Sequence, residues 1–182
     1  VLAVPVYIGF RLLGIVAVDE MEGLASIFFS DDRVNSLAVR LFQEEAFSAR
    51  AMQRPLLGWG GYGRGWPVDT ATGRLLVQAV DSLWVHTLST RGLLGLAALY
   101  MSLGIGPWLT LGRQSSQGDR SQAVFSPQRI DALVLSLILV FFMIDSLMNG
   151  LVNPVYTIGA GALVSYHLTQ ADRKSTRLNS SH

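Results

Sequence analysis

The sequence predicts an all-α protein: a polytopic bundle of transmembrane helices with a large, partly helical loop outside the cytoplasm. Half of the 182 residues are hydrophobic and only 15% are charged, which is typical of membrane proteins. The segment from Gly92 to Gly112 contains no charged residue. At 1.5 Å per residue, this segment is long enough to cross a hydrocarbon core of about 30 Å.

Four segments are candidate spans, and polar segments separate the first three. The second and third spans flank a short polar segment, in which Arg113, Arg120 and Arg129 outnumber Asp119. Short loops rich in arginine stay in the cytoplasm, so the longer loop is expected on the opposite side of a multi-pass protein. The predicted order is a first, incomplete span at 1–18, the extracytoplasmic loop at 19–84, a span at 85–112, the cytoplasmic loop at 113–129, and spans at 130–152 and 153–171.

The final segment, 172–182, resembles a translated sequencing adapter, so neither its basic residues nor its Asn-Ser-Ser triplet is interpreted. The chain begins inside an apolar element, which indicates a fragment. It contains no cysteine, and its three histidines lie far apart, so we expect no metal and no cofactor. A nucleic-acid partner is not expected either.

Within the loop, a helix is predicted over residues 33–53, with Asp31 and Asp32 as its N-cap region. Apolar residues fall on one side of this helix, whereas Arg33, Leu37, Arg40 and Glu44 fall on the other. One interpretation is a surface helix supported by an Arg40–Glu44 pair at i,i+4. The other is a helix lying on the bilayer, with its arginines turned toward an anionic substrate.

A glycine-rich run follows Pro55, which is expected to end that helix. Residues 58–63 satisfy the G-x-G-x-x-G spacing, but no strand precedes them and no helix opens at Gly63, so a dinucleotide site is rejected. The aromatic residues of this run, Trp59, Tyr62 and Trp66, suit either a membrane interface or stacking on a sugar.

Three motifs occur in order along the loop and the span that follows it. They are Arg33-Val-Asn-Ser-Leu37, Pro55-Leu-Leu-Gly-Trp-Gly60, and Asp81-Ser82 separated by nine residues from Gly92-Leu-Leu-Gly95. Together they resemble the bacterial O-antigen ligase and O-antigen polymerase superfamily over about residues 33–112. The resemblance implies a multi-pass glycosyltransferase of the bacterial inner (cytoplasmic) membrane, active in surface polysaccharide assembly. Its donor would be a polyprenyl-diphosphate-linked glycan, and its acceptor a hydroxyl of another glycan or lipid.

The resemblance also implies roles for individual residues. Asp81 stands where the family usually has histidine, and it could act as a general base, orient the acceptor, or mark an inactive branch. Arginine binds phosphate bidentately and could stabilise a leaving diphosphate without a metal. The expected catalytic residues are Asp81 and Arg40, and the expected substrate-binding residues are Arg33, Arg64, Trp59 and Ser82. His86 lies on a different helix face from Asp81 and is a poor substitute for the histidine.

Two alternatives stay open at this point: a membrane transporter and a non-catalytic membrane subunit. A transporter should repeat polar residues through several spans, whereas here only Asp145 and Asn149 stand out. Asp145 is expected either to pair with Arg11 or to line the acceptor path. A non-catalytic subunit would tolerate the loss of Arg40 or Asp81.

Overall fold

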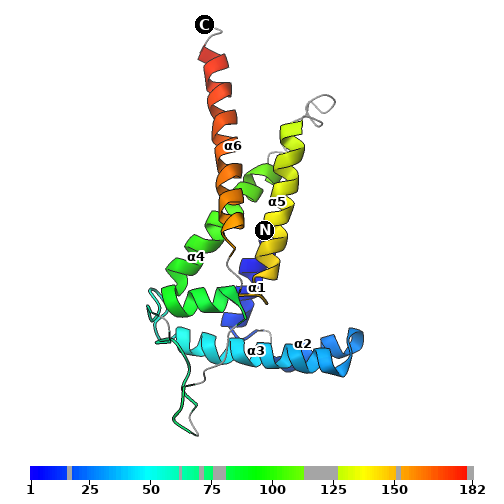
Figure 1. Cartoon of the computed structure of the whole chain (residues 1–182), viewed down its shortest axis with the longest axis vertical. Coiled ribbons are helices and arrows are strands. Elements are labelled where there is room, and N and C mark those ends of the chain that lie inside the picture. The colour runs from blue at the N-terminus through cyan, green and yellow to red at the C-terminus, as the bar shows by residue number, and fades with distance from the viewer. Residues whose placement is uncertain are drawn as a thin grey trace. The chain divides into compact units, whose positions relative to one another are not determined.

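The described part of the chain is helical, in agreement with the predicted all-α class. The computed structural model describes residues 1–15, 18–61, 63–69, 72–75, 81–112, 127–150 and 153–179, and for 173–175 and 177–179 the backbone only. Within these ranges no strand forms beyond a single β-bridge between Val68 and Leu75. The six helices are α1 (Ala3–Leu12), α2 (Val18–Phe28), α3 (Asp31–Ala51), α4 (Leu83–Gly112), α5 (Pro127–Asp145) and α6 (Pro154–Asn179) (Figure 1).

Both ends of helix α3 lie within two residues of the ends predicted for the loop helix, but its N-cap differs from the prediction. Ser30 occupies the N-cap position with an extended ψ of 156°, and Asp31 and Asp32 form the first helical turn. Carboxylates there interact favourably with the unpaired amides at the positive end of the helix dipole. The aspartates therefore support the N-terminus from inside the helix.

Helix α2 was not predicted, because its residues were assigned to the loop as a whole. Ala25 is buried, and the apolar side chains of Leu24, Ile27 and Phe28 are 64%, 70% and 78% exposed. These three residues share one face of the helix, since positions three and four apart lie on the same side. The acidic residues Asp19 and Glu22 fall on another face, whereas Glu20 lies one turn before Leu24 on the exposed face.

Two helices, α4 and α5, are long and apolar enough to cross a membrane among the residues described. Helix α4 begins nine residues before the uncharged stretch and contains a kink at Gly92, where φ is 68° and ψ is −168°. Helix α1, at the first expected span, is apolar but has only 10 residues. Helix α6 covers the fourth expected span and continues into the segment that resembles an adapter.

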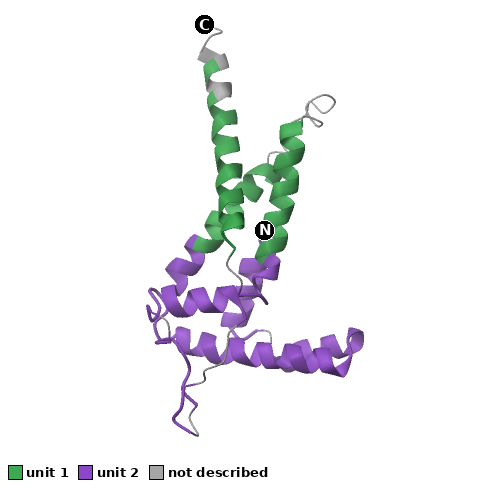
Figure 2. Ribbon diagram, in the orientation of Figure 1, with its two compact units in different colours: residues 1, 99–143, 153–182 green, residues 2–98, 144–152 purple. Residues whose placement is uncertain are grey.

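The chain forms two compact units, shown in Figure 2. The first comprises residues 1, 99–143 and 153–182, and the second comprises residues 2–98 and 144–152. Most of the expected cytoplasmic loop, 113–126, lies outside the described residues, as do Tyr62 and residues 16–17, 70–71, 76–80, 151–152 and 180–182. All the candidate site residues belong to the second unit.

In the first unit, small residues let helices approach closely. A Cβ added at Gly106 in α4 would lie 2.8 Å from the Cβ of Leu163 in α6, so a side chain there would separate the two helices. One turn further along, the Thr110 hydroxyl lies 2.9 Å from Nε2 of His167. Small residues such as glycine allow this close approach of two helices.

Candidate functional site

The face of helix α3 that is buried in the second unit is mostly apolar and carries one carboxylate. Glu44 is 1% exposed, and Leu41, Phe47 and Ala51 are also buried. By contrast, Phe42 is 65% exposed, although it belongs to the predicted apolar side. The sequence correctly predicted an amphipathic helix, but the buried face combines Leu41 of the predicted apolar side with Glu44 of the predicted polar side, and the Arg40 side chain stays 45% exposed.

The two expected catalytic residues lie close to each other outside the buried face. Nε of Arg40 lies 3.9 Å from Oδ2 of Asp81, and the two side chains are 45% and 54% exposed. An ion pair this exposed contributes only about 0–1 kcal/mol to stability, because water screens it. Both groups are therefore accessible to a ligand, and a charged ligand could displace either one from the other.

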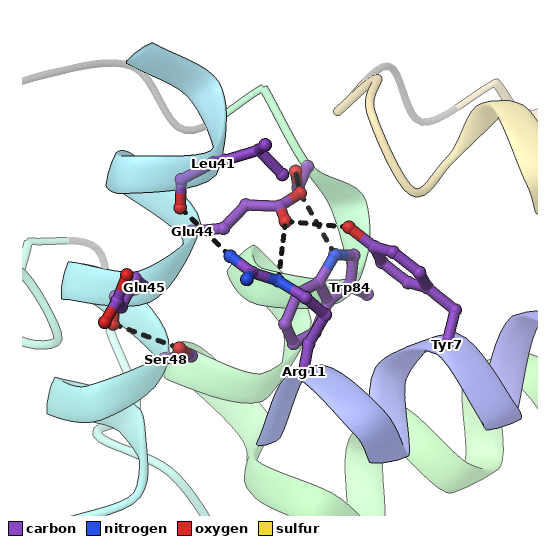
Figure 3. Close-up of polar contacts among 8 residues, drawn as sticks. Tyr7, Arg11, Leu41, Glu44, Glu45, Ser48 and Trp84 are labelled. Carbon is purple, nitrogen blue, oxygen red and sulfur yellow. Dashed lines mark hydrogen bonds and ion pairs between the residues drawn. The ribbon is translucent and has the colours of Figure 1, made fainter. Parts of the chain in front are cut away.

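Glu44 is the centre of a buried polar cluster that the sequence did not indicate (Figure 3). Its Oε1 accepts hydrogen bonds from the Ser82 hydroxyl and, at 3.3 Å, from Nε1 of Trp84. Its Oε2 accepts a hydrogen bond from the Tyr7 hydroxyl at 3.3 Å and lies 3.9 Å from Nε of Arg11. The cluster joins α1, α3 and the beginning of α4 through one carboxylate.

These contacts correct two expectations. The predicted Arg40–Glu44 pair is wrong, because the glutamate bonds to other segments and Arg40 turns to Asp81. The predicted pairing of Arg11 with Asp145 is wrong as well, since Arg11 approaches Glu44 and donates a hydrogen bond from Nη2 to the Leu41 carbonyl at 3.1 Å. Asp145 is exposed at the end of α5.

Burial raises the pKa of Glu44 above its ordinary value of 4.5. The hydrogen bond from Ser82 and the charge of Arg11 act in the opposite direction and offset part of this effect. A group whose pKa is raised on folding stabilises the fold below its unfolded pKa. That contribution is lost as the pH rises through the folded value.

We expect the thermal stability of the protein to show this loss from pH 4.5 upward. A Glu44→Gln variant stays neutral at every pH and should lose that part of the pH dependence. The comparison requires melting curves of both proteins over one pH series, which cancels the contributions of the other carboxylates. Identical slopes for the two proteins would contradict the raised pKa.

The glycine turn after α3 docks on the kink of α4. The amide of Leu93 donates to the Pro55 carbonyl at 2.6 Å, and the amide of Trp59 donates to the Ser89 carbonyl at 2.8 Å. A Cβ at Gly58 would lie 2.6 Å from the backbone nitrogen of Gly92, so a side chain does not fit there. The kink frees backbone groups of α4 that an unbroken helix would use internally, and the turn bonds to them. The second and third motifs therefore form one packed structure.

Trp59 contacts arginines that the sequence analysis did not select. Its ring lies 3.8 Å from the guanidinium carbon of Arg50 and 4.4 Å from that of Arg54. Its Nε1 donates to the Arg50 carbonyl at 3.0 Å. These cation–π contacts attach the glycine turn to the end of α3.

The remaining candidate residues are placed in different ways. Ser82 is 3% exposed, and its hydroxyl is committed to Glu44. Arg33 and Arg64 are exposed, and in the described part of the chain neither side chain makes a hydrogen bond or an ion pair. His86 is exposed in the first turns of α4. No group of three or more His, Cys, Asp or Glu residues that could hold a metal is present within the described ranges.

No protein-family model matches this chain, and neither does any curated protein or solved structure.

Proposed function

We propose that this chain is part of a membrane glycosyltransferase of the O-antigen ligase or polymerase type. It would transfer a glycan from a polyprenyl-diphosphate-linked donor to an acceptor hydroxyl outside the cytoplasm. The observation that carries the proposal is the accessible pair formed by Arg40 and Asp81. The pair combines a phosphate-binding cation with a carboxylate that can accept a proton.

Two further observations support the proposal. The turn at residues 55–60 packs against Gly92, so two of the three motifs that resemble the family form a single structure. In the apolar 18-residue stretch of α5, 22% is buried, whereas the core helix of a soluble protein is mostly buried. The exposed apolar surface of α5 suits contact with lipid.

The proposed reaction is a displacement at the anomeric carbon of the donor sugar. The acceptor oxygen forms a bond to that carbon while the bond from carbon to phosphate oxygen breaks, and the polyprenyl diphosphate leaves with the electron pair. Asp81 removes the proton from the hydroxyl of the acceptor and later releases it to water. Arg40 binds the leaving diphosphate through its charged guanidinium group.

An Arg40→Ala variant should reduce the turnover number for glycan transfer about 10²-fold, because the leaving diphosphate loses a charged donor. Removing one such donor usually lowers the turnover number by about 10²- to 10³-fold. We expect the low end of this range, because the Arg40 side chain is about half exposed and water screens its charge. The full-length protein is reconstituted in liposomes with a polyprenyl-diphosphate-linked oligosaccharide, and the product is followed by mass spectrometry. Arg74→Ala, which removes another exposed arginine of the same loop, is the matched control.

A charge exchange separates catalysis from simple pairing. The double variant Arg40→Asp/Asp81→Arg restores the ion pair but exchanges the positions of the phosphate-binding cation and the proton-accepting carboxylate. Transfer should remain as low as in Arg40→Ala. Recovery of transfer in the double variant, or full activity of Arg40→Ala, would count against the proposal and favour a non-catalytic subunit.

A further inference from the structure

The buried cluster around Glu44 bears directly on the geometry of the proposed active site. Three segments meet at its carboxylate: α1 through Tyr7 and Arg11, α3 itself, and the start of α4 through Ser82 and Trp84. In Figure 3 the side chains of Tyr7, Arg11 and Trp84 converge on Glu44 from α1 and α4. All the contacts lie within the second unit.

The register of two segments of the chain, α3 and the start of α4, connects this cluster to the candidate catalytic pair. Arg40 precedes Glu44 by four residues, which places both side chains on one face of α3, one turn apart. Asp81 immediately precedes Ser82, whose hydroxyl bonds to Glu44. A bond between Ser82 and Glu44 therefore sets the backbone of residue 81 opposite residue 40.

The catalytic pair cannot provide this alignment by itself. Its two atoms are 3.9 Å apart, and both side chains are about half exposed, so solvent competes for each. In contrast, Glu44 and Ser82 are 1% and 3% exposed, and hydrogen bonds between buried groups are expensive to break. The contact that aligns the two segments is therefore the buried hydrogen bond between Ser82 and Glu44, whereas the side chains of Arg40 and Asp81 are exposed to solvent.

We infer that Glu44 is a positioning residue that holds Asp81 opposite Arg40 by accepting hydrogen bonds from the Ser82 hydroxyl and the Trp84 indole. It touches neither donor nor acceptor. The effect of Glu44 on glycan transfer rests on the proposed function. Its effect on the placement of residue 81 opposite residue 40 does not depend on that function.

The geometric part is tested by cross-linking. The chain has no cysteine, so Arg40→Cys and Asp81→Cys introduce two unique thiols for a short bifunctional methanethiosulfonate reagent. Adding Glu44→Ala should lower the cross-linked fraction of the monodisperse protein about tenfold, because two hydrogen bonds that align the segments are lost. Glu45→Ala is the matched control, since the side chain of Glu45 is exposed and makes no bond in the cluster.

The catalytic part is tested on the full-length protein without the cysteines. Glu44→Ala should lower the turnover number for glycan transfer about tenfold and leave the KM for the donor nearly unchanged, since the arginines remain. Glu44→Gln keeps an acceptor for Ser82 and Trp84, so it should restore both the turnover number and the cross-linking. If Glu44→Ala fails to fold, Ser82→Ala takes its place in both assays.

The outcomes separate the two proposals. Cross-linking in Glu44→Ala or Ser82→Ala equal to that in Glu45→Ala would overturn the positioning role. Reduced cross-linking in a protein whose unmodified form transfers no glycan would uphold the positioning role and reject the proposed function. Normal transfer in Glu44→Ala despite reduced cross-linking would overturn the catalytic consequence.

Discussion

Replacing Asp81 with asparagine should lower the turnover number for glycan transfer about 10²- to 10⁴-fold, the usual contribution of a general base. Asparagine keeps the size of the side chain but cannot accept the proton of the acceptor hydroxyl. The side chain is 54% exposed and leaves the Ser82–Glu44 contact untouched, so folding should be normal. The measurement is the transfer assay in liposomes, with saturating donor and a varied concentration of acceptor.

A histidine at this position provides the complementary test. The resemblance places a histidine where this chain has Asp81, and a neutral imidazole is also a proton acceptor. Asp81→His should therefore retain much of the transfer that Asp81→Asn loses. Asp32→Asn, at another exposed carboxylate of the same unit, is the control and should be close to unmodified protein. Equal rates in all the variants would remove Asp81 from the mechanism.

A Gly58→Ala substitution should destabilise the protein by about 4 kcal/mol, through two effects of similar size. Gly58 has a φ of +68°, which side chains rarely adopt, and an added Cβ would lie 2.6 to 2.7 Å from backbone atoms of α4. The opposing atoms belong to the backbone, so they cannot turn aside as a flexible side chain would. The turn would have to lift off the kink and lose hydrogen bonds such as that from Leu93 to Pro55.

A substitution at Gly60 separates the backbone strain from the steric clash. Its φ is +80°, but no atom lies within 4 Å of an added Cβ, so Gly60→Ala carries only the backbone strain, about 1–2 kcal/mol. Thermal and chemical denaturation in detergent, followed by tryptophan fluorescence, would report both variants, since Trp59 lies between these glycines. Equal losses for Gly58→Ala and Gly60→Ala would mean that the turn does not dock on α4 as described.

The orientation of α3 shows where the sequence stops being informative. The period of its apolar residues correctly indicated an amphipathic helix near residues 33–53. The same period could not say which face meets protein, because an apolar stripe is stable against lipid as well as against a protein core. Phe42 of the predicted apolar side is exposed and the carboxylate of Glu44 is buried, whereas Leu41 of the predicted apolar side is buried.

Glu44 itself could not have been selected from its position in the sequence. A buried carboxylate is tolerated only with several donors, and its donors here lie 37 to 40 residues away in sequence. Asp81 was selected by its place in the motif and Arg40 by the helix face that it shares with Arg33, and the structure brings Arg40 and Asp81 to within 3.9 Å. Arg33 and Arg64 were selected as well, and the structure leaves both exposed without bringing either to the pair.

The sequence by itself determined the helical class, the two long apolar helices and the motif residues, because helix propensity, hydropathy and glycine conformation act locally along the chain. Only the tertiary structure decided which face of α3 is buried, which partner Arg40 takes and how the glycine turn meets α4. Those choices depend on contacts between distant segments, where burial makes each hydrogen bond depend on the exact position of its partner.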